Sequence, residues 1–209
     1  MTAEPLNLLA RALDPAVEPP ADETSERILD AALALSAASG VQHLTMDAVA
    51  RRARVGRMTV YRRFGDKERL VEALAVREGR RCLAALDAAS PPDAPIEDQV
   101  AAGFATSLRL VREHPLLGRL ARVEPESVLA ALTSEGGALF SMMRAYLAER
   151  LRAAQRAGVL GDVDVEARAE LLVRLTFSFV LIQDSVLPLD DEEHVREAAR
   201  RHLVPLLTG

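Results

Sequence analysis

Aromatic residues are scarce in this sequence: Phe, Tyr and Trp together make up 3% of its 209 residues, and Trp is absent. Hydrophobic residues still account for 49%, so Ala and Leu have to supply most of the core. Both are strong helix formers, which favours an all-α fold over a sheet. The length suits one medium domain or a small domain joined to a larger one.

Cysteine is nearly absent too. The single Cys82 excludes a disulfide within the chain and fits a reducing cytoplasm. The four histidines, His43, His114, His194 and His202, lack the spacing of metal ligands. No phosphate-binding loop, dinucleotide fingerprint or nucleophile elbow is present. We therefore expect no metal, no cofactor and no catalytic residue.

Long hydrophobic runs are lacking as well. The most apolar run, from Leu171 to Ile182, is too short to span a bilayer and contains Arg174. The start of the chain, from Met1 to Ala21, has neither the basic residues nor the apolar core of a signal peptide. We expect a soluble, cytoplasmic protein without a membrane partner.

The charge is unevenly distributed. The net charge is −5, which shows no nucleic-acid signature, but residues 22–81 contain twelve Lys/Arg against nine Asp/Glu. The other segments are correspondingly acidic. Such asymmetry is typical of a DNA-reading module joined to a module that avoids DNA, although the excess is modest.

Residues 44–70 predict a helix-turn-helix. Thr45 can cap a first short helix, with Asp47 in its first turn, where the helix dipole favours an anion. A turn at residues 53–56 precedes a second helix over residues 57–64, and a cap at Asp66 opens a third. Two short helices joined by a tight turn, the second of them basic, are typical of this DNA-binding motif.

The same stretch resembles the DNA-binding domain of the tetracycline-repressor (TetR) family of bacterial transcription regulators. The residues that carry the resemblance are Ile28, Leu29, Ala31, Ala32, Leu35, Gly40, Leu44, Thr45, Val49, Ala50, Ala53, Val55 and the run Thr59 to Leu70. Two positions depart from the family pattern, which usually has Gly at Arg54 and a small polar residue at Gly56. Arg54 is therefore expected to adopt a left-handed backbone, at some cost in free energy.

The resemblance also implies roles for individual residues. It makes Thr45, Tyr61 and Lys67 phosphate contacts on double-stranded operator DNA. Candidates for reading base edges are Arg57, Met58, Thr59 and Arg62, and Arg63 completes the basic cluster. The chemistry agrees, because arginine pairs with two acceptors of guanine and the Thr59 methyl group suits a thymine methyl. A charged cluster can also be a plain solvated surface, but its position on the second helix of this motif favours DNA.

We predict three parts: a Pro-rich flexible arm over residues 1–23, the DNA-binding domain over 24–71, and a ligand-sensing and dimerisation domain over 72–209. The arm contains one arginine and three acidic residues before residue 22, which argues against a DNA-contacting arm. About nine helices are expected, which is also the number that the resemblance implies. The helical segments are 24–38, a short one from the cap at Thr45 to the turn at 53–56, 57–64, 66–88, 96–113, 116–122, a short one to about 132, 138–157, 165–186 and 191–207.

The larger domain offers candidate positions for an unknown small-molecule effector, which family members commonly hold there. The bulky apolar candidates are Phe104, Leu108, Met142, Met143, Tyr146, Phe177 and Phe179. The polar candidates are Arg109, His114, Arg174 and Gln183. Each of these residues also fits an ordinary role in the core or on the surface.

The last two helices predict a dimer surface. The helix over 165–186 is apolar on more than one side, so that both of its faces have to be covered. The candidates are Leu171, Leu175, Phe179 and Ile182 on this helix, and Val195, Ala199, Leu203 and Leu206 on the last one. The resemblance implies a homodimer joined by a four-helix bundle, with two recognition helices on successive turns of DNA.

The sequence thus predicts a sequence-specific DNA-binding regulator, a repressor released from a palindromic operator by an effector. The alternative class is a helical ligand carrier or small enzyme whose basic helix is incidental. Activation in place of repression also stays open, because the sequence does not distinguish the two.

Overall fold

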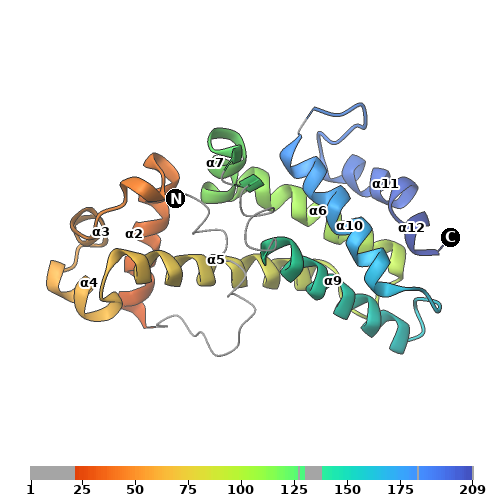
Figure 1. Cartoon of the computed structure of the whole chain (residues 1–209), viewed down its shortest axis with the longest axis horizontal. Helices are drawn as coiled ribbons and strands as arrows, with labels where there is room; N and C mark the ends of the chain where they lie inside the picture. Colours follow the sequence, from red (N-terminus) through yellow and green to blue (C-terminus); the bar gives the residue numbers. More distant parts are fainter. Residues whose placement is uncertain (1–21, 127, 130–137, 183, 209) are drawn as a thin grey trace. The chain divides into compact units, whose positions relative to one another are not determined.

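The computed structural model describes residues 22–126, 128–129, 138–182 and 184–208, and within these ranges every regular element is a helix. The expected all-α fold is therefore confirmed (Figure 1). The described residues form two compact units. One comprises those up to Arg81 and those between Pro115 and Leu139, and the other comprises Cys82–His114 and the residues from Phe140 onward. None of the described helices is long and apolar enough to cross a membrane.

The first unit contains the predicted helix-turn-helix. Its elements are α2 (Glu23–Ser39), the 3₁₀ turn η2 (Val41–His43), α3 (Met46–Ala53), α4 (Arg57–Phe64), the first part of α5 (Lys67–Ala89) and α7 (Pro115–Val123). Figure 1 shows α2, α3 and α4 gathered around the start of α5. The core shared by these helices includes Ile28, Leu29, Val49, Val60, Phe64, Leu70 and Leu74. Helix α7 belongs to this unit although it lies within residues 72–209 of the chain.

Local chemistry explains where these helices begin and end. The carboxylate of Asp22 accepts from the N–H groups of Thr24 and Ser25, so it caps α2. Thr45 caps α3 through the N–H of Ala48, as predicted. Asp66 accepts from the N–H of Arg69 at 2.8 Å at the start of α5, which also confirms its predicted capping role. Gly65 ends α4 with a φ of 79°, in the left-handed region.

The turn between α3 and α4 is strained at Arg54. Its φ and ψ are 55° and 45°, and among the described residues other than glycine it alone has a positive φ. The prediction of a left-handed backbone at this position is confirmed. The Arg54 N–H donates to the carbonyl of Arg51, and the Val55 N–H donates to that of Ala50. The guanidinium of Arg27 on α2 donates to the carbonyl of Ala53 at 2.7 Å, which ties the end of α3 to α2.

A buried ion cluster joins α2 to α5. Arg77 is 4% exposed, and its Nη1 donates to the carboxylates of Glu26 (3.0 Å) and Asp30 (2.9 Å) on α2. Its Nε donates to Glu78, itself buried, at 2.7 Å. Arg81 donates to Glu26 and Glu78 from the surface side. A buried charge is tolerated only with such partners, so this cluster specifies how α5 lies on α2.

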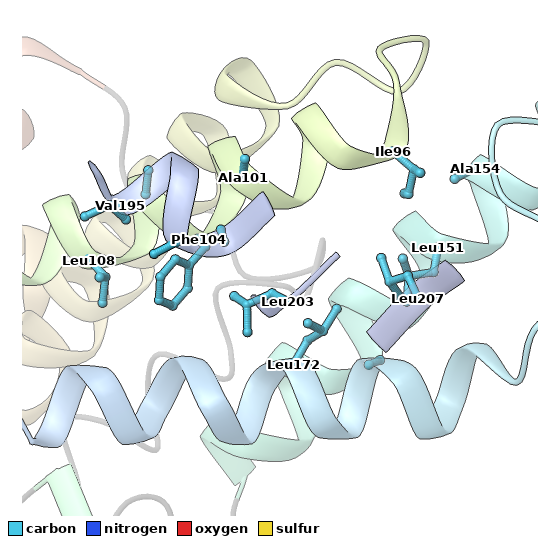
Figure 2. Close-up of a cluster of buried hydrophobic side chains, with 14 of the residues drawn as sticks. Ile96, Ala101, Phe104, Leu108, Leu151, Ala154, Leu172, Val195, Leu203 and Leu207 are labelled. Carbon is cyan, nitrogen blue, oxygen red and sulfur yellow. The ribbon is translucent and has the colours of Figure 1, made fainter. Parts of the chain in front are cut away.

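The second unit is a group of helices packed around a hydrophobic core of their own. It consists of the last turns of α5, α6 (Ile96–Glu113), α9 (Ala138–Arg156) from Phe140 onward, α10 (Val165–Leu181), α11 (Glu192–His202) and α12 (Pro205–Thr208). Figure 2 shows its core residues Ile96, Phe104, Leu151, Leu172, Leu203 and Leu207 converging from these helices. Helices α10 and α11 both pack against α6.

Two predicted helix ends are wrong. Helix α10 ends at Leu181, not near Val186, and its C-cap Ile182 already has an extended backbone. Further on, the Leu187 N–H donates to the hydroxyl of Ser185 in a local turn and not to a helical carbonyl. The last predicted helix is divided into α11 and α12. Pro205 lacks an N–H and disfavours the helical conformation at Val204, so the helix breaks there. The predicted arm before Asp22 and most of the predicted helix near Leu132 lie outside the described residues.

Replacing Arg54 by glycine should stabilise the protein, because glycine adopts the left-handed backbone without a steric penalty. We expect the free energy of unfolding to rise by about 1 kcal/mol in urea denaturation. The matched control is Arg52→Gly, since Arg52 is equally exposed but helical, and this change should lower the free energy by about 1 kcal/mol. Equal destabilisation by both changes would contradict a strained Arg54.

Candidate nucleic-acid interface

Helix α4 has one face in the core and one face in solvent. Val60 and Phe64 are 0% and 5% exposed and fix the helix in the first unit, whereas Met58 is 76% exposed. Arg57 and Arg62 are exposed as well, and Thr59 is half-buried. Among the described residues, Arg62 has no ion pair or hydrogen bond of its own. The solvent face of α4 therefore carries the four residues predicted to read bases.

The three predicted phosphate contacts surround the ends of the motif. Thr45 is exposed at the start of α3, and Tyr61 is half-buried on α4. Lys67, the first residue of α5, donates from Nζ to the carbonyl of Gln42 at 2.7 Å. This bond leaves two ammonium protons for an external acceptor. Helix N-termini with nearby hydroxyl and ammonium groups suit phosphate oxygens.

Arg57 is held in place by its neighbours. Its Nε lies 2.9 Å from Oδ1 of Asp47 on α3, an ion pair by distance although the N–H is not aligned as a hydrogen bond requires. Its Nη2 donates to the Tyr61 hydroxyl at 3.4 Å, and the guanidinium lies 5.3 Å from the centre of the Tyr61 ring. The bond to Tyr61, followed by the charge of Asp47, raises the pKa of Arg57. Arg57 is therefore charged and has partners on both α3 and α4.

Arg63, which was predicted as part of the DNA-binding cluster, is turned towards α2. Its Nη1 pairs with the carboxylate of Asp22 and donates to the hydroxyl of Ser25 at 2.9 Å. The side chain is half-buried, and Ser25 is fully buried. Nη1 of the guanidinium thus bonds the N-terminal cap of α2, so Arg63 supports the fold, and its role as a DNA contact stays a prediction. The hydrogen bond from Ser25, and further the charge of Arg63, lowers the pKa of Asp22.

Two residues predicted for an effector pocket lie in the core of the second unit. Phe104 and Leu108 are 6% and 3% exposed, and Phe104 meets the half-buried Phe179 edge to face with ring centres 5.5 Å apart. These side chains belong to the core that α6 shares with α10 and α11. Their role in an effector site stays a prediction.

The other effector candidates are more accessible. Met142, Met143 and Phe177 are half-buried, and Phe177 lies 6.3 Å from the ring of Phe140. Arg174 is exposed over the Phe140 ring and bonds Glu170 at 2.6 Å, which lowers the pKa of that carboxyl. The remaining polar candidates divide: Arg109 pairs with Glu113 at 3.7 Å, His114 is half-buried, and Gln183 lies outside the described residues.

Tyr146 belongs to a polar cluster between α5 and α9. Its hydroxyl donates to Asp87 at 2.6 Å, and Arg150 donates to the same carboxylate at 2.6 Å. Arg150 also donates to the backbone carbonyl of Ser90. Burial, followed by the bond to Asp87, raises the pKa of the Tyr146 hydroxyl, which stays protonated. Asp87 and Arg150 had no signal in the sequence, because the two residues are 63 positions apart.

The predicted dimer residues divide into two groups. On α10 and its C-terminal cap, Leu171, Leu175 and Ile182 are 44%, 37% and 64% exposed. Val195, Ala199 and Leu203, in contrast, are buried in the core of their own chain, and Leu206 and Phe179 pack against it. The apolar stripe of α11 is covered by α6, so we correct these three buried residues from dimer surface to core.

The fold and this surface define the class of protein: a helix-turn-helix, DNA-binding transcriptional regulator. Residues 28–74 match the family described as "Bacterial regulatory proteins, tetR family". This finding confirms the resemblance seen in the sequence.

Three relatives illustrate the likeness. An uncharacterized HTH-type transcriptional regulator of Mycobacterium tuberculosis is 25% identical over 189 residues, or 88% of this chain and 85% of the relative. The HTH-type transcriptional regulator SrpR of Pseudomonas putida is 44% identical over 54 residues, or 26% of this chain and 25% of the relative. GusR of Salmonella enterica has the same fold, with a TM-score of 0.64 and 24% identity over 88% of this chain and 95% of GusR.

The lowered pKa of Asp22 makes its contribution to stability dependent on pH. Because the pKa is lower in the folded protein than the ordinary value of 3.8, the stabilisation is present above that value and is lost as the pH falls through the folded pKa. The change Asp22→Asn should therefore destabilise the protein at pH 7 and have a smaller effect at acidic pH. Urea unfolding of both proteins from pH 7 to 3 measures this difference. A difference that does not depend on pH would contradict an ionised cap.

Proposed function

We propose that this regulator is a homodimeric repressor that binds a palindromic operator and leaves it when a small-molecule effector binds. The observation that supports this proposal is that one chain has two exposed surfaces of different chemistry. One is the basic solvent face of α4, and the other is the aliphatic stripe of α10. Under this proposal, residues 24–71 bind DNA, and residues 72–209 dimerise and sense the effector.

The DNA contacts follow from exposure and chemistry. Arg57, Met58, Thr59 and Arg62 lie on the solvent face of α4 and read base edges in the major groove. Thr45, Tyr61 and Lys67 bond phosphates at the rim. Arg63 is left out of this set because its guanidinium is committed to Asp22 and Ser25.

The dimer surface consists of Leu171, Leu175 and Ile182. The three recur at helical spacing on α10 and its cap, and each is more than a third exposed. A repeated aliphatic stripe of this kind suits the same stripe of a second chain across a two-fold axis. The two-fold axis in turn matches a palindromic operator whose half-sites lie about one turn of DNA, roughly 34 Å, apart.

Repression is the simpler regulatory outcome. A dimer on its operator blocks a promoter by occupancy alone, whereas activation needs a further surface for the transcription machinery. The partly buried Met142, Met143 and Phe177, together with Tyr146 and Arg174, are our candidates for effector contacts. Helix α5 starts in the DNA-binding unit and ends in the other one, so it is the element through which effector binding would change the separation of the two α4 helices.

The DNA contacts can be tested with the full chain and a library of random duplexes. We expect selection of a palindrome, with an affinity that falls steeply as salt rises, because bound phosphates release counterions. Arg62→Gln should weaken binding to the selected duplex about tenfold or more. The control Arg112→Gln removes an equally exposed arginine from α6 and should leave binding unchanged. Absence of any selected sequence would contradict the proposal.

The dimer can be tested by replacing Leu171 and Leu175 together with Asp, since buried carboxylates should abolish the association. Sedimentation at micromolar concentration should then give a monomer, against a dimer for the unchanged chain. Val123→Asp alters a comparably exposed apolar residue in the first unit and serves as the control, which should still sediment as a dimer. A dimeric double variant would place the interface elsewhere.

A further inference from the structure

We infer that Asp47 is a specificity-determining positioning residue, which holds Arg57 ready to read a guanine. Asp47 lies on α3 and Arg57 is the first residue of α4, so the pair joins the two helices of the motif. This inference rests on the DNA-binding function proposed above and adds to it the base that one side chain selects.

The number of donors on Arg57 supports this role. A guanidinium has five N–H groups: one on Nε and two on each Nη. Asp47 lies against Nε, and the Tyr61 hydroxyl accepts from Nη2. Within the described part of the chain, three N–H groups on Nη1 and Nη2 remain for an external acceptor. These are the groups that pair with O6 and N7 of guanine.

The surroundings of Arg57 keep the guanidinium in one place. The Tyr61 ring lies beneath it at 5.3 Å, and Tyr61 is itself half-buried on α4. A long arginine side chain in water loses considerable rotamer freedom when it binds. Here much of that loss has occurred before DNA arrives, so more of the contact energy contributes to recognition of the base.

Asp47 also depends on Arg57. Its Oδ1 is buried and accepts no aligned hydrogen bond from the described residues, and Arg57 is the one cation that they place within ion-pair distance. The Asp47 side chain is 46% exposed as a whole, so the cost of removing the cation falls on this one buried oxygen. The pair is therefore kept when the motif approaches the negative backbone of DNA. Asp47 thereby opposes a simple phosphate contact by Arg57 and favours a directed contact with a base.

The experiment compares base preference in full-length variants by selection from a random duplex library. We expect wild-type protein to select guanine at one position of each half-site, and Arg57→Gln to lose that guanine alone. In Asp47→Asn, the preference for guanine over the other bases at this position should fall at least about fivefold. Its affinity for unselected duplex should be equal or higher, because a negative charge is gone. The double variant should match Arg57→Gln, since Asp47 acts through Arg57.

The matched control is Glu68→Gln. Glu68 is an exposed carboxylate in the first turn of α5, so it has the same place on its helix as Asp47, and no ion pair in the described structure. This change should tighten binding to unselected duplex and leave every base preference intact. A merely structural role for Asp47 would lower binding at all positions together, and that result would overturn the inference.

Two other outcomes would also overturn it. One is an Asp47→Asn protein with an unchanged guanine preference, and the other is an effect of Asp47→Asn that persists when Arg57 is already Gln. Either would show that Asp47 does not act through Arg57. If the wild-type chain selects no sequence, the proposed DNA-binding function itself fails, which is distinguishable from both.

Discussion

The buried guanidinium of Arg77 is the constraint on which the first unit depends. Leu70 and Leu74 press α5 against the core, but apolar contacts are not directional and would tolerate a slide along the helix. Arg77 permits no such slide, because its Nη1 and Nε have to meet carboxylates on both α2 and α5. Since α4 leads directly into α5 through Gly65 and Asp66, the register of α5 also determines where α4 lies against α2.

Several arginines of this unit bond groups of the fold, so fewer of them are available to an external ligand than the charge count suggests. Arg27 bonds the end of α3, and Arg63 bonds the cap of α2. Arg62, in contrast, is exposed and has no partner among the described residues. Charge counts therefore overestimate the surface available to phosphates. Specificity therefore has to come from a few side chains at defined places.

Features fixed by neighbouring residues could be predicted from the sequence. The bounds of α4 and α6 and the caps Thr45 and Asp66 follow from short-range backbone chemistry. The left-handed Arg54 is implied by the family resemblance, in which glycine is usual at that position. The long-range partners of individual side chains could not be predicted from the sequence. Arg63 is basic and lies on the right helix, but nothing near it in the chain indicates that Asp22, 41 positions earlier, occupies it. Likewise the apolar stripe of α11 predicts that something covers it, and only the fold shows that the cover is α6.

A carboxylate on a surface that meets DNA needs a physical reason, since it repels phosphates and weakens all binding. The helix dipole favours Asp47 in the first turn of α3, which Thr45 caps, but the dipole gives no reason for the pairing of Asp47 with Arg57. What matters to a regulator, however, is the ratio of its affinity for the operator to its affinity for the far more numerous other DNA sites. A negative charge lowers the affinity for all DNA sequences to a similar extent. If the same group also orients an arginine towards one base, it regains affinity for the operator alone and so raises specificity while total affinity falls. The Asp47–Arg57 pair has the geometry for this exchange.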